Sequence, residues 1–142
     1  MTIEHVDPPE IARPVSDVYH QLAIAPALGL VAIAGQVAVD IDGALVGAGD
    51  HEAQAEQAFR NFAGALVAAG CRPADLLKNT VHVVGHHAGL VEPIFAAGRR
   101  AFNGDWPRTA STLLGVQSLG RPEWLIEIDG LAVIPADSSR RT

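Results

Sequence analysis

Charged residues are scarce in this chain of 142 residues, at 18% against about 25% in ordinary globular domains. Hydrophobic residues make up 49%, which excludes the composition of a disordered protein. Fewer charges leave less surface committed to water, so we expect a partner to cover part of it. The net charge is −6, and basic residues adjoin only at Arg99-Arg100 and Arg140-Arg141. Because nucleic acid is bound by clustered basic side chains, it is not expected as a partner.

Cysteine and long apolar runs are also nearly absent. Cys71 is the only cysteine, which excludes an intrachain disulfide and a metal site of several cysteines, and predicts a structural role in a reducing compartment. The longest apolar stretch, residues 22–39, is broken by Pro26, Gly29 and Gly35, so no membrane helix is expected. Residues 1–9 lack the basic and apolar segments of a secretory signal. These absences predict a cytoplasmic protein with no membrane partner.

The length predicts a single domain over residues 1–142, with a core at about 14–134 and extended or frayed ends at 1–13 and 135–142. Short runs rich in branched apolar residues predict strands. They lie at residues 18–25, 28–39, 75–85, 111–119 and 124–134, with a possible short strand at 44–46 after an Asp-Gly turn.

Two helices are predicted between these strands. Residues 50–70 carry an apolar stripe at spacings of three and four, with Asp50 as N-cap and Gly70 as C-terminal cap. Residues 90–102 form the second helix, which tolerates Pro93 only in its first turn. The order β-β-(β)-α-β-α-β-β is typical of an α+β domain with two helices on one face of a mixed sheet.

The predicted strands 30–34, 112–116 and 131–134 are apolar at consecutive positions. Consecutive residues of a strand point to opposite faces of the sheet, so both faces need cover. Two helices cover only one face, and self-association is the simplest way to cover the other.

Several segments, in this order, resemble the RidA (YjgF) family over about residues 14–134. Residues 34–39 (AGQVAV) are similar to its SGQ-x-P segment, and the helix ending in AAGC at 68–71 to its EAAG ending. Residues 103–108 (NGDWPR), 114–119 (LGVQSL) and 126–133 (IEIDGLAV) match its C-terminal half. The resemblance implies a chorismate-mutase-like fold, a homotrimer with clefts between subunits, and hydrolysis of enamines or imines without metal or cofactor.

The resemblance also implies roles for single residues. Glu127 matches the family glutamate that positions or activates water. The family arginine, which grips the substrate carboxylate, falls near Arg108 when counted from Pro107 but on Ser111 when counted back from the following strand. Strand parity places Ser111 and Leu113 on one face, so the chain resembles a branch that lacks the catalytic arginine. Either Arg108 or Ser111 therefore takes that position.

Further substrate-binding positions follow from the same resemblance. Gly35 lies where the family backbone approaches the ligand, and Tyr19 matches its PY-x-Q aromatic residue. Leu113 occupies a position often held by cysteine. Glu92 and Phe95 occupy positions of asparagine and tyrosine, so the pocket differs from that of better-known members. Gly35 and Tyr19 also have purely structural interpretations, as a bulge in a strand and as a core aromatic residue of a hairpin.

Three function classes remain open at this point. The first is an enamine/imine (2-iminoacid) deaminase, and the second a trimer that binds a small carboxylate or imine metabolite without turnover. The third, an endoribonuclease, is disfavoured by the acidic charge. A metal site at His82, His86 and His87 is not expected, because no carboxylate or cysteine lies at ligand spacing.

Overall fold

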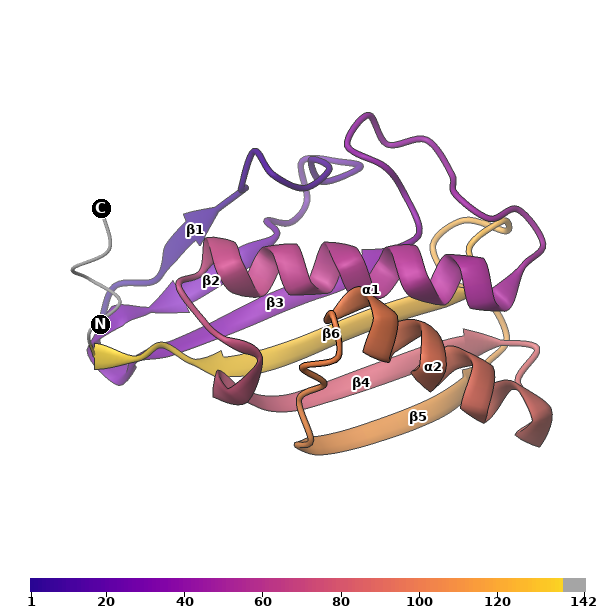
Figure 1. Cartoon of the computed structure of the whole chain (residues 1–142). Helices are drawn as coiled ribbons and strands as arrows, with labels where there is room; N and C mark the ends of the chain where they lie inside the picture. Colours follow the sequence, from indigo (N-terminus) through magenta and orange to yellow (C-terminus); the bar gives the residue numbers. More distant parts are fainter. Residues whose placement is uncertain (137–142) are drawn as a thin grey trace.

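The computed structural model describes residues 1–136 as one mixed sheet with two helices (Figure 1). Of the expected frayed end at 135–142, residues 137–142 lie outside the described residues. The strands follow the spatial order β1-β2-β3-β6-β4-β5, and all neighbours are antiparallel except β4 and β5. They are β1 (Glu4–Val6), β2 (Leu22–Ala25), β3 (Leu30–Val37), β4 (Leu76–Val84), β5 (Ala110–Val116) and β6 (Ile126–Val133).

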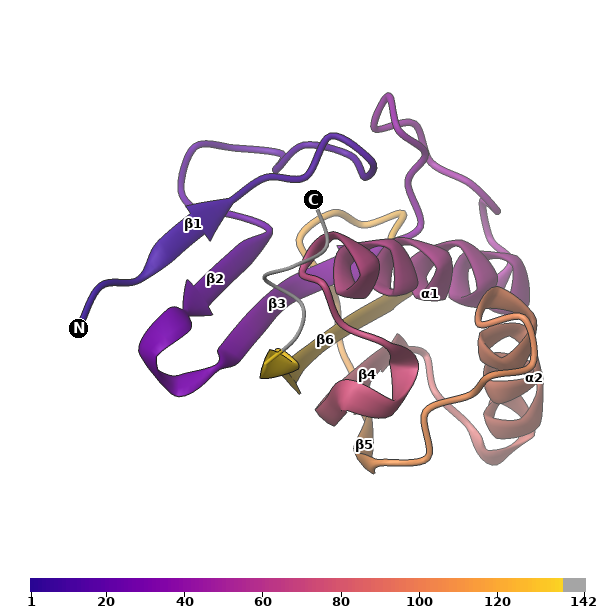
Figure 2. The same ribbon diagram turned by 60° about the vertical axis from the view of Figure 1, so that its left-hand side comes forward.

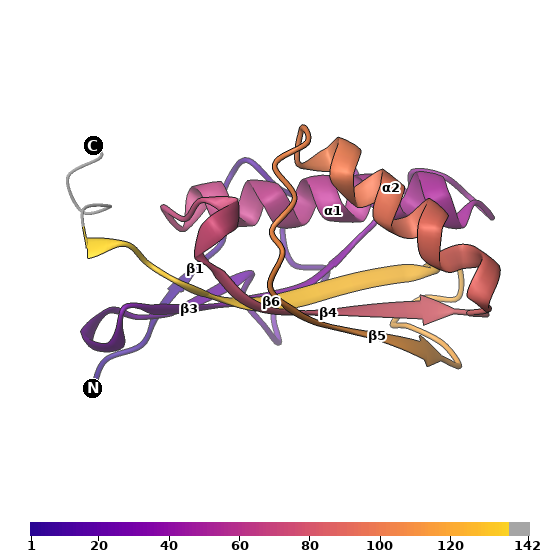
Figure 3. The ribbon, with the colours of Figure 1, turned by 60° about the horizontal axis from the view of Figure 1, so that its bottom comes forward.

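The helices are α1 (His51–Ala68) and α2 (Val91–Ala101), and both lie on the same face of the sheet (Figure 3). Three short 3-10 turns occur at Pro26–Leu28, Pro73–Asp75 and Ala88–Leu90. The predicted α+β fold is thereby confirmed.

The N-terminal end differs most from the sequence-based expectation. Residues 4–6, expected only to be extended, form β1 at the outer edge of the sheet beside β2 (Figure 2). The predicted strand at 18–25 begins only at Leu22, because the preceding residues belong to a loop fixed by Asp7, whose carboxylate accepts hydrogen bonds from Gln21 N and His20 Nδ1. The possible strand at 44–46 is reduced to one bridge between Val39 and Leu45.

Helix α1 forms where the apolar stripe and its cap predict it. The Asp50 carboxylate accepts a hydrogen bond from Ala53 N at 3.0 Å, which satisfies one free amide of the first turn. Phe59 and Phe62 are about 1% exposed and form the centre of the core against the sheet. Gly70 has a φ of 77°, as expected for a glycine that ends a helix.

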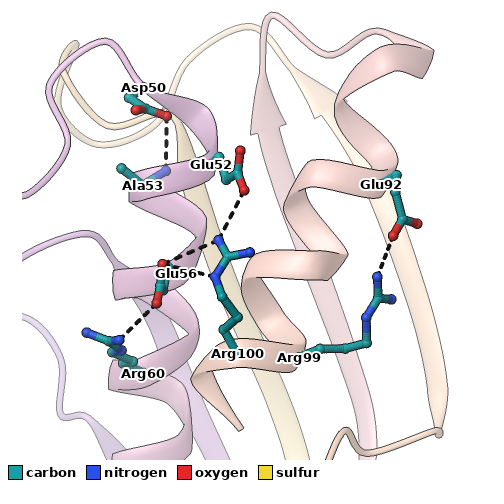
Figure 4. Close-up of polar contacts among 8 residues, drawn as sticks. All are labelled: Asp50, Glu52, Ala53, Glu56, Arg60, Glu92, Arg99 and Arg100. Atoms are coloured by element: carbon teal, nitrogen blue, oxygen red, sulfur yellow. Dashed lines mark hydrogen bonds and ion pairs between the residues drawn. The ribbon is translucent and has the colours of Figure 1, made fainter. Parts of the chain in front are cut away.

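Helix α2 packs beside α1 through an apolar seam and a surface ion network. A Cβ atom on Gly98 would lie 2.5 Å from Trp106 Cζ3, so the ring occupies the space that a side chain would take. On the exposed side, Arg100 of α2 reaches Glu52 and Glu56 of α1 (Figure 4). Pro93 lies in the first turn of α2, where its missing amide costs no hydrogen bond.

The alternation of side chains divides β4 and β6 between the two faces of the sheet. Ile126, Ile128, Val81 and Val83 are fully buried toward the helices. The residues that alternate with them point to the opposite face; they are Glu127, Asp129, Lys78, Thr80 and His82. This face, called here the open face, is covered by neither helix (Figure 3). Leu114 of β5, whose register partner is His82, is 44% exposed on the same face.

Candidate functional site

Glu127 lies over Gly35 on the open face. Glu127 belongs to β6 and is held between Ile126 and Ile128, both fully buried on the helix side. Beside it, the β3–β6 register shifts between Ile33 and Gln36, and this irregularity contains Gly35. A Cβ atom on Gly35 would lie 2.2 Å from Glu127 Oε1 and 2.7 Å from its Cδ. The carboxyl group therefore occupies space that exists only because residue 35 is glycine.

The surroundings of Glu127 change its acidity. Burial raises the pKa of Glu127 above its reference value, His82 opposes that shift, and the charge of Asp129 adds to it. The carboxyl group thus accepts a proton more readily than an ordinary glutamate. Raised carboxyl pKa values of this kind are frequent where a protein uses an acid or base.

His82 is the part of this site that the sequence did not single out as functional. It is the register partner of Glu127 in the β4–β6 pair, and its Nδ1 donates a hydrogen bond to Glu127 O at 3.1 Å. The alternation of β4 would have placed it on the open face, but its partner on β6 becomes known only from the register.

Arg108 and Ser111 line a different cavity, of about 540 Å³, at the start of β5. Arg108 makes no hydrogen bond or ion pair within the described part of the chain. The Ser111 hydroxyl donates to Asn79 Oδ1, which belongs to a side chain buried among the helix-facing residues of β4. The remaining lining comes from Phe95, Trp106, Pro107 and Thr109.

Within one chain, Glu127 and Arg108 do not share a cavity. The register places Glu127 beside His82 and Leu114, whereas Arg108 comes two residues before β5 begins. The separation of six residues between Arg108 and Leu114 spans about 20 Å if the chain is extended. Ser111 pairs with Asn79 on the helix-facing side, and Glu127 faces the other way. The two predicted groups of site residues therefore lie apart.

The other predicted positions are also scattered. Leu113 is on the same face as Ser111, next to Val81. The Glu92 side chain is 79% exposed, pairs with Arg99 and lies outside the 540 Å³ cavity.

Tyr19 lines a second cavity, of about 1020 Å³, which is formed by the N-terminal loop. Its hydroxyl accepts a hydrogen bond from Val15 N at 3.1 Å. This contact fixes the loop, and the Glu127–Gly35 pair does not line that cavity.

No group of three His, Cys, Asp or Glu side chains within residues 1–136 could hold a metal ion. Burial raises the pKa of the Cys71 thiol to about 11, which keeps it protonated and unreactive. None of the helices in the described range has the length and apolarity required to span a membrane.

The sequence profile of the Endoribonuclease L-PSP family matches residues 10–134. The chain belongs to this family, which is the RidA (YjgF) family. A comparison with curated proteins gave no match. The crystal structure of YyfB from Yersinia pestis, described as a protein of unknown function of the conserved Rid family, is 33% identical. It has a TM-score of 0.68, and the match covers 94% of this chain and 99% of that one.

Two further solved structures show the same fold at lower identity. Yeast Mmf1 is 23% identical with a TM-score of 0.79, over 94% of this chain and all of that one, at 100%. Escherichia coli TdcF, solved with bound serine, is 20% identical with a TM-score of 0.77, over 92% and 98% of the two chains. The RidA family fold thus covers nearly the whole chain, from the N-terminal loop to β6.

Proposed function

We propose that this RidA family protein hydrolyses reactive enamines and imines to keto acids and ammonia, with Glu127 as the residue that positions or activates water. The observation that carries the proposal is the half-buried carboxyl group of Glu127 seated over Gly35. A carboxylate of raised pKa on an open sheet face suits general acid–base catalysis, because it can both take and return a proton.

The proposed chemistry needs water placed against an electrophilic carbon. The Glu127 carboxylate accepts a proton from the attacking water and returns it when the amine leaves. General acid–base catalysis of this kind contributes about 10²–10⁴-fold to a rate. We propose no metal and no organic cofactor for this reaction.

Assembly is part of the proposal, because Glu127 and Arg108 lie apart within a single chain. We propose a cytoplasmic homotrimer in which the open face is covered by other copies. In clefts between subunits, Arg108 or Ser111 of one copy would approach Glu127 of another. Nucleic acid and membranes are not proposed as partners.

The absence of an arginine at the counted position lowers the expected affinity for substrates that carry a carboxylate. Ser111, at the position counted for the family arginine, offers a hydroxyl group that Asn79 already engages. A charged bidentate contact contributes roughly 1.5–3 kcal/mol, so its absence weakens carboxylate binding by about one to two orders of magnitude. Activity on small imino acids such as 2-iminopropanoate is therefore expected to be weak.

The test is ammonia release from imino acids generated freshly by an amino-acid oxidase. Glu127→Gln removes the proton acceptor and is expected to lower the rate at least about 10²-fold. Asp129→Asn, a matched change two residues along the same strand face, is expected to keep most of it. Equal rates for wild type and Glu127→Gln would reject the assignment. If Arg108→Ala abolished hydrolysis while Ser111→Ala did not, Arg108 would hold the carboxylate after all.

Binding without turnover is a second candidate, favoured by the separation of Arg108 from Glu127. TdcF, a fold relative, was solved with serine, which is consistent with a small carboxylate ligand for this chain. Calorimetry with L-serine and pyruvate, combined with no ammonia release from any imine, would select this candidate. Degradation of single-stranded RNA, lost in Glu127→Gln, would instead revive the endoribonuclease reading.

A further inference from the structure

We infer that His82 is a second proton-transfer residue of the Glu127 site, with its Nε2 atom as the group that exchanges a proton with the substrate. This inference rests on the proposed function and extends it from one acid–base group to two. Its basis is the direct cross-strand pairing of His82 with Glu127 on the open face.

The hydrogen bond of His82 fixes which ring nitrogen is free. Its Nδ1 lies 3.1 Å from Glu127 O, and a carbonyl oxygen only accepts, so Nδ1 carries a proton. The neutral ring then has its lone pair on Nε2. Protonation and deprotonation of the ring occur at Nε2, while the Nδ1 bond holds the ring in place.

The pairing also places the ring within reach of the same substrate. Directly opposite residues of an antiparallel pair have Cβ atoms about 4.5–5.5 Å apart. His82 is half-buried, and so is Glu127. A small planar imine lying on the open face against these two side chains would therefore have a carboxylate and an imidazole beside it.

Few other charges act on this pair. On the open face, Asp129 lies two residues along β6 from Glu127, and Lys78 lies four along β4 from His82, with its Nζ on Thr112 Oγ1. The nearby residues of β3 and β5, Gly35, Val37 and Leu114, carry no titratable side chain. His82 is thus the one cation-forming group in direct register with Glu127 among residues 1–136.

Together, Glu127 and His82 can accept and donate every proton that the reaction moves. The cycle starts with Glu127 ionised and with a proton on His82 Nε2 as well as on Nδ1. In the addition step, the water oxygen bonds to the imine carbon, its proton passes to Glu127, and the imine nitrogen takes the Nε2 proton of His82. In the elimination step, the C–N bond breaks and the hydroxyl proton returns to Nε2. Glu127 then gives its proton to the departing nitrogen, which leaves as ammonia. Both side chains end in their starting states, and no oxidant or reductant is needed.

Three other histidines of the described chain are held by hydrogen bonds of their own. The His51 ring bonds Val84 O, the His20 ring bonds Asp7, and His87 Nδ1 accepts from Gly89 N. His87 is exposed beyond the end of β4 and serves as a matched control.

The experiment compares His82→Asn with His87→Asn in the imine hydrolysis assay between pH 5 and pH 9. Asparagine retains an amide donor near the Nδ1 position, which can still bond Glu127 O, but has no Nε2. His82→Asn should lower the rate at pH 6 by about 10²-fold and change the shape of the pH profile, because Nε2 is no longer there to exchange a proton. His87→Asn should change neither.

The outcomes separate the two proposals. If wild type hydrolyses imines and His82→Asn retains both its rate and its pH profile, the His82 inference is overturned and the Glu127 assignment stands. If wild type releases no ammonia from any imine, the proposed function fails and the His82 role fails with it. Thermal melts and sedimentation of both variants check folding; should His82→Asn not fold, His82→Gln takes its place in the same comparison.

Discussion

At the scale of single residues, the site depends on the missing side chain of Gly35 beside the Glu127 carboxyl group. Gly35 provides the space and Glu127 fills it, and the two residues come from neighbouring strands far apart in the sequence. Burial raises the pKa of Glu127, so the same packing that confines the side chain also gives it basic character.

Replacing Gly35 with alanine is expected to remove activity more than stability. The new Cβ would lie 2.2 Å from Glu127 Oε1, and the flexible carboxyl group can rotate away toward the open face. Imine hydrolysis should fall at least about tenfold, as expected for a misplaced catalytic group. The double variant with Glu127→Gln should be no slower than Glu127→Gln alone, because both changes act through one carboxyl group. Multiplicative losses in the double variant would show that Gly35 acts independently.

The raised pKa of Glu127 also predicts how stability depends on pH. Since the pKa in the folded chain lies above the reference value of 4.5, the stabilising contribution of this group is complete below that value. It is lost as pH rises through the folded pKa. Glu127→Gln should therefore gain stability relative to wild type between pH 4 and pH 7. Thermal melts at both pH values measure the difference, and an equal gap at the two would contradict the shift.

How much of the site the sequence could predict differs between its residues. The resemblance indicated Glu127 and Gly35 separately, because each has a local motif. Their contact could not be read from the sequence, since it depends on the β3–β6 register and on the irregularity near Gly35. The role of His82 was missed for the same reason. Strand direction and parity separate Arg108 from Glu127 within a chain, and the expected cleft between subunits, with Arg108 or Ser111 at the arginine position, stays a prediction.

At the scale of elements, prediction succeeded where the sequence carries a burial pattern. Helix α1 was predicted to within two residues from its stripe and its Asp50 cap. Strand β1 was missed because all three of its residues are exposed, so that no burial pattern marks it in the sequence. Edge elements of this kind leave no periodicity in the sequence.

Gly130→Ala and Gly115→Ala make the same change on two strands and should differ in stability. On β6, a Cβ at residue 130 would lie 2.6 Å from Phe62 Cζ and 2.7 Å from the Lys78 carbonyl oxygen, which is backbone and cannot rotate away. Overpacking of this kind costs about 1–3 kcal/mol. On β5, a Cβ at residue 115 would lie 3.2 Å from His86 Cβ at an exposed edge, so the cost should be smaller. Urea denaturation measures both, and equal losses would contradict the packing described for α1.

At the scale of the whole molecule, the sheet has one densely packed face and one that neither helix covers. The open face combines apolar residues such as Leu114 with the polar row of His82 and Glu127. Family membership is consistent with a homotrimer that buries this face. The single-domain organisation over residues 1–142 stays a prediction.

Sedimentation is expected to give a trimer that one charge on the open face dissociates. Leu114→Asp places a charge at a residue that is 44% exposed in the single chain and that we expect to be buried in the assembly. Val67→Asp is the matched control, because Val67 is 72% exposed on α1. The control should remain a trimer. A monomeric wild-type chain would contradict the proposed assembly.

The alternation of β6 has a consequence for how the protein tolerates variation. Even-numbered positions from Ile126 to Ala132 face the helices, and odd-numbered positions from Glu127 face outward. In a screen of all substitutions along β6, polar residues at even-numbered positions should cause loss of soluble protein at any temperature. Odd positions should yield folded but inactive or dissociated chains. In evolution, the odd-numbered residues of β6 could therefore change, and the chemistry of the open face with them, while the even-numbered core residues stay the same.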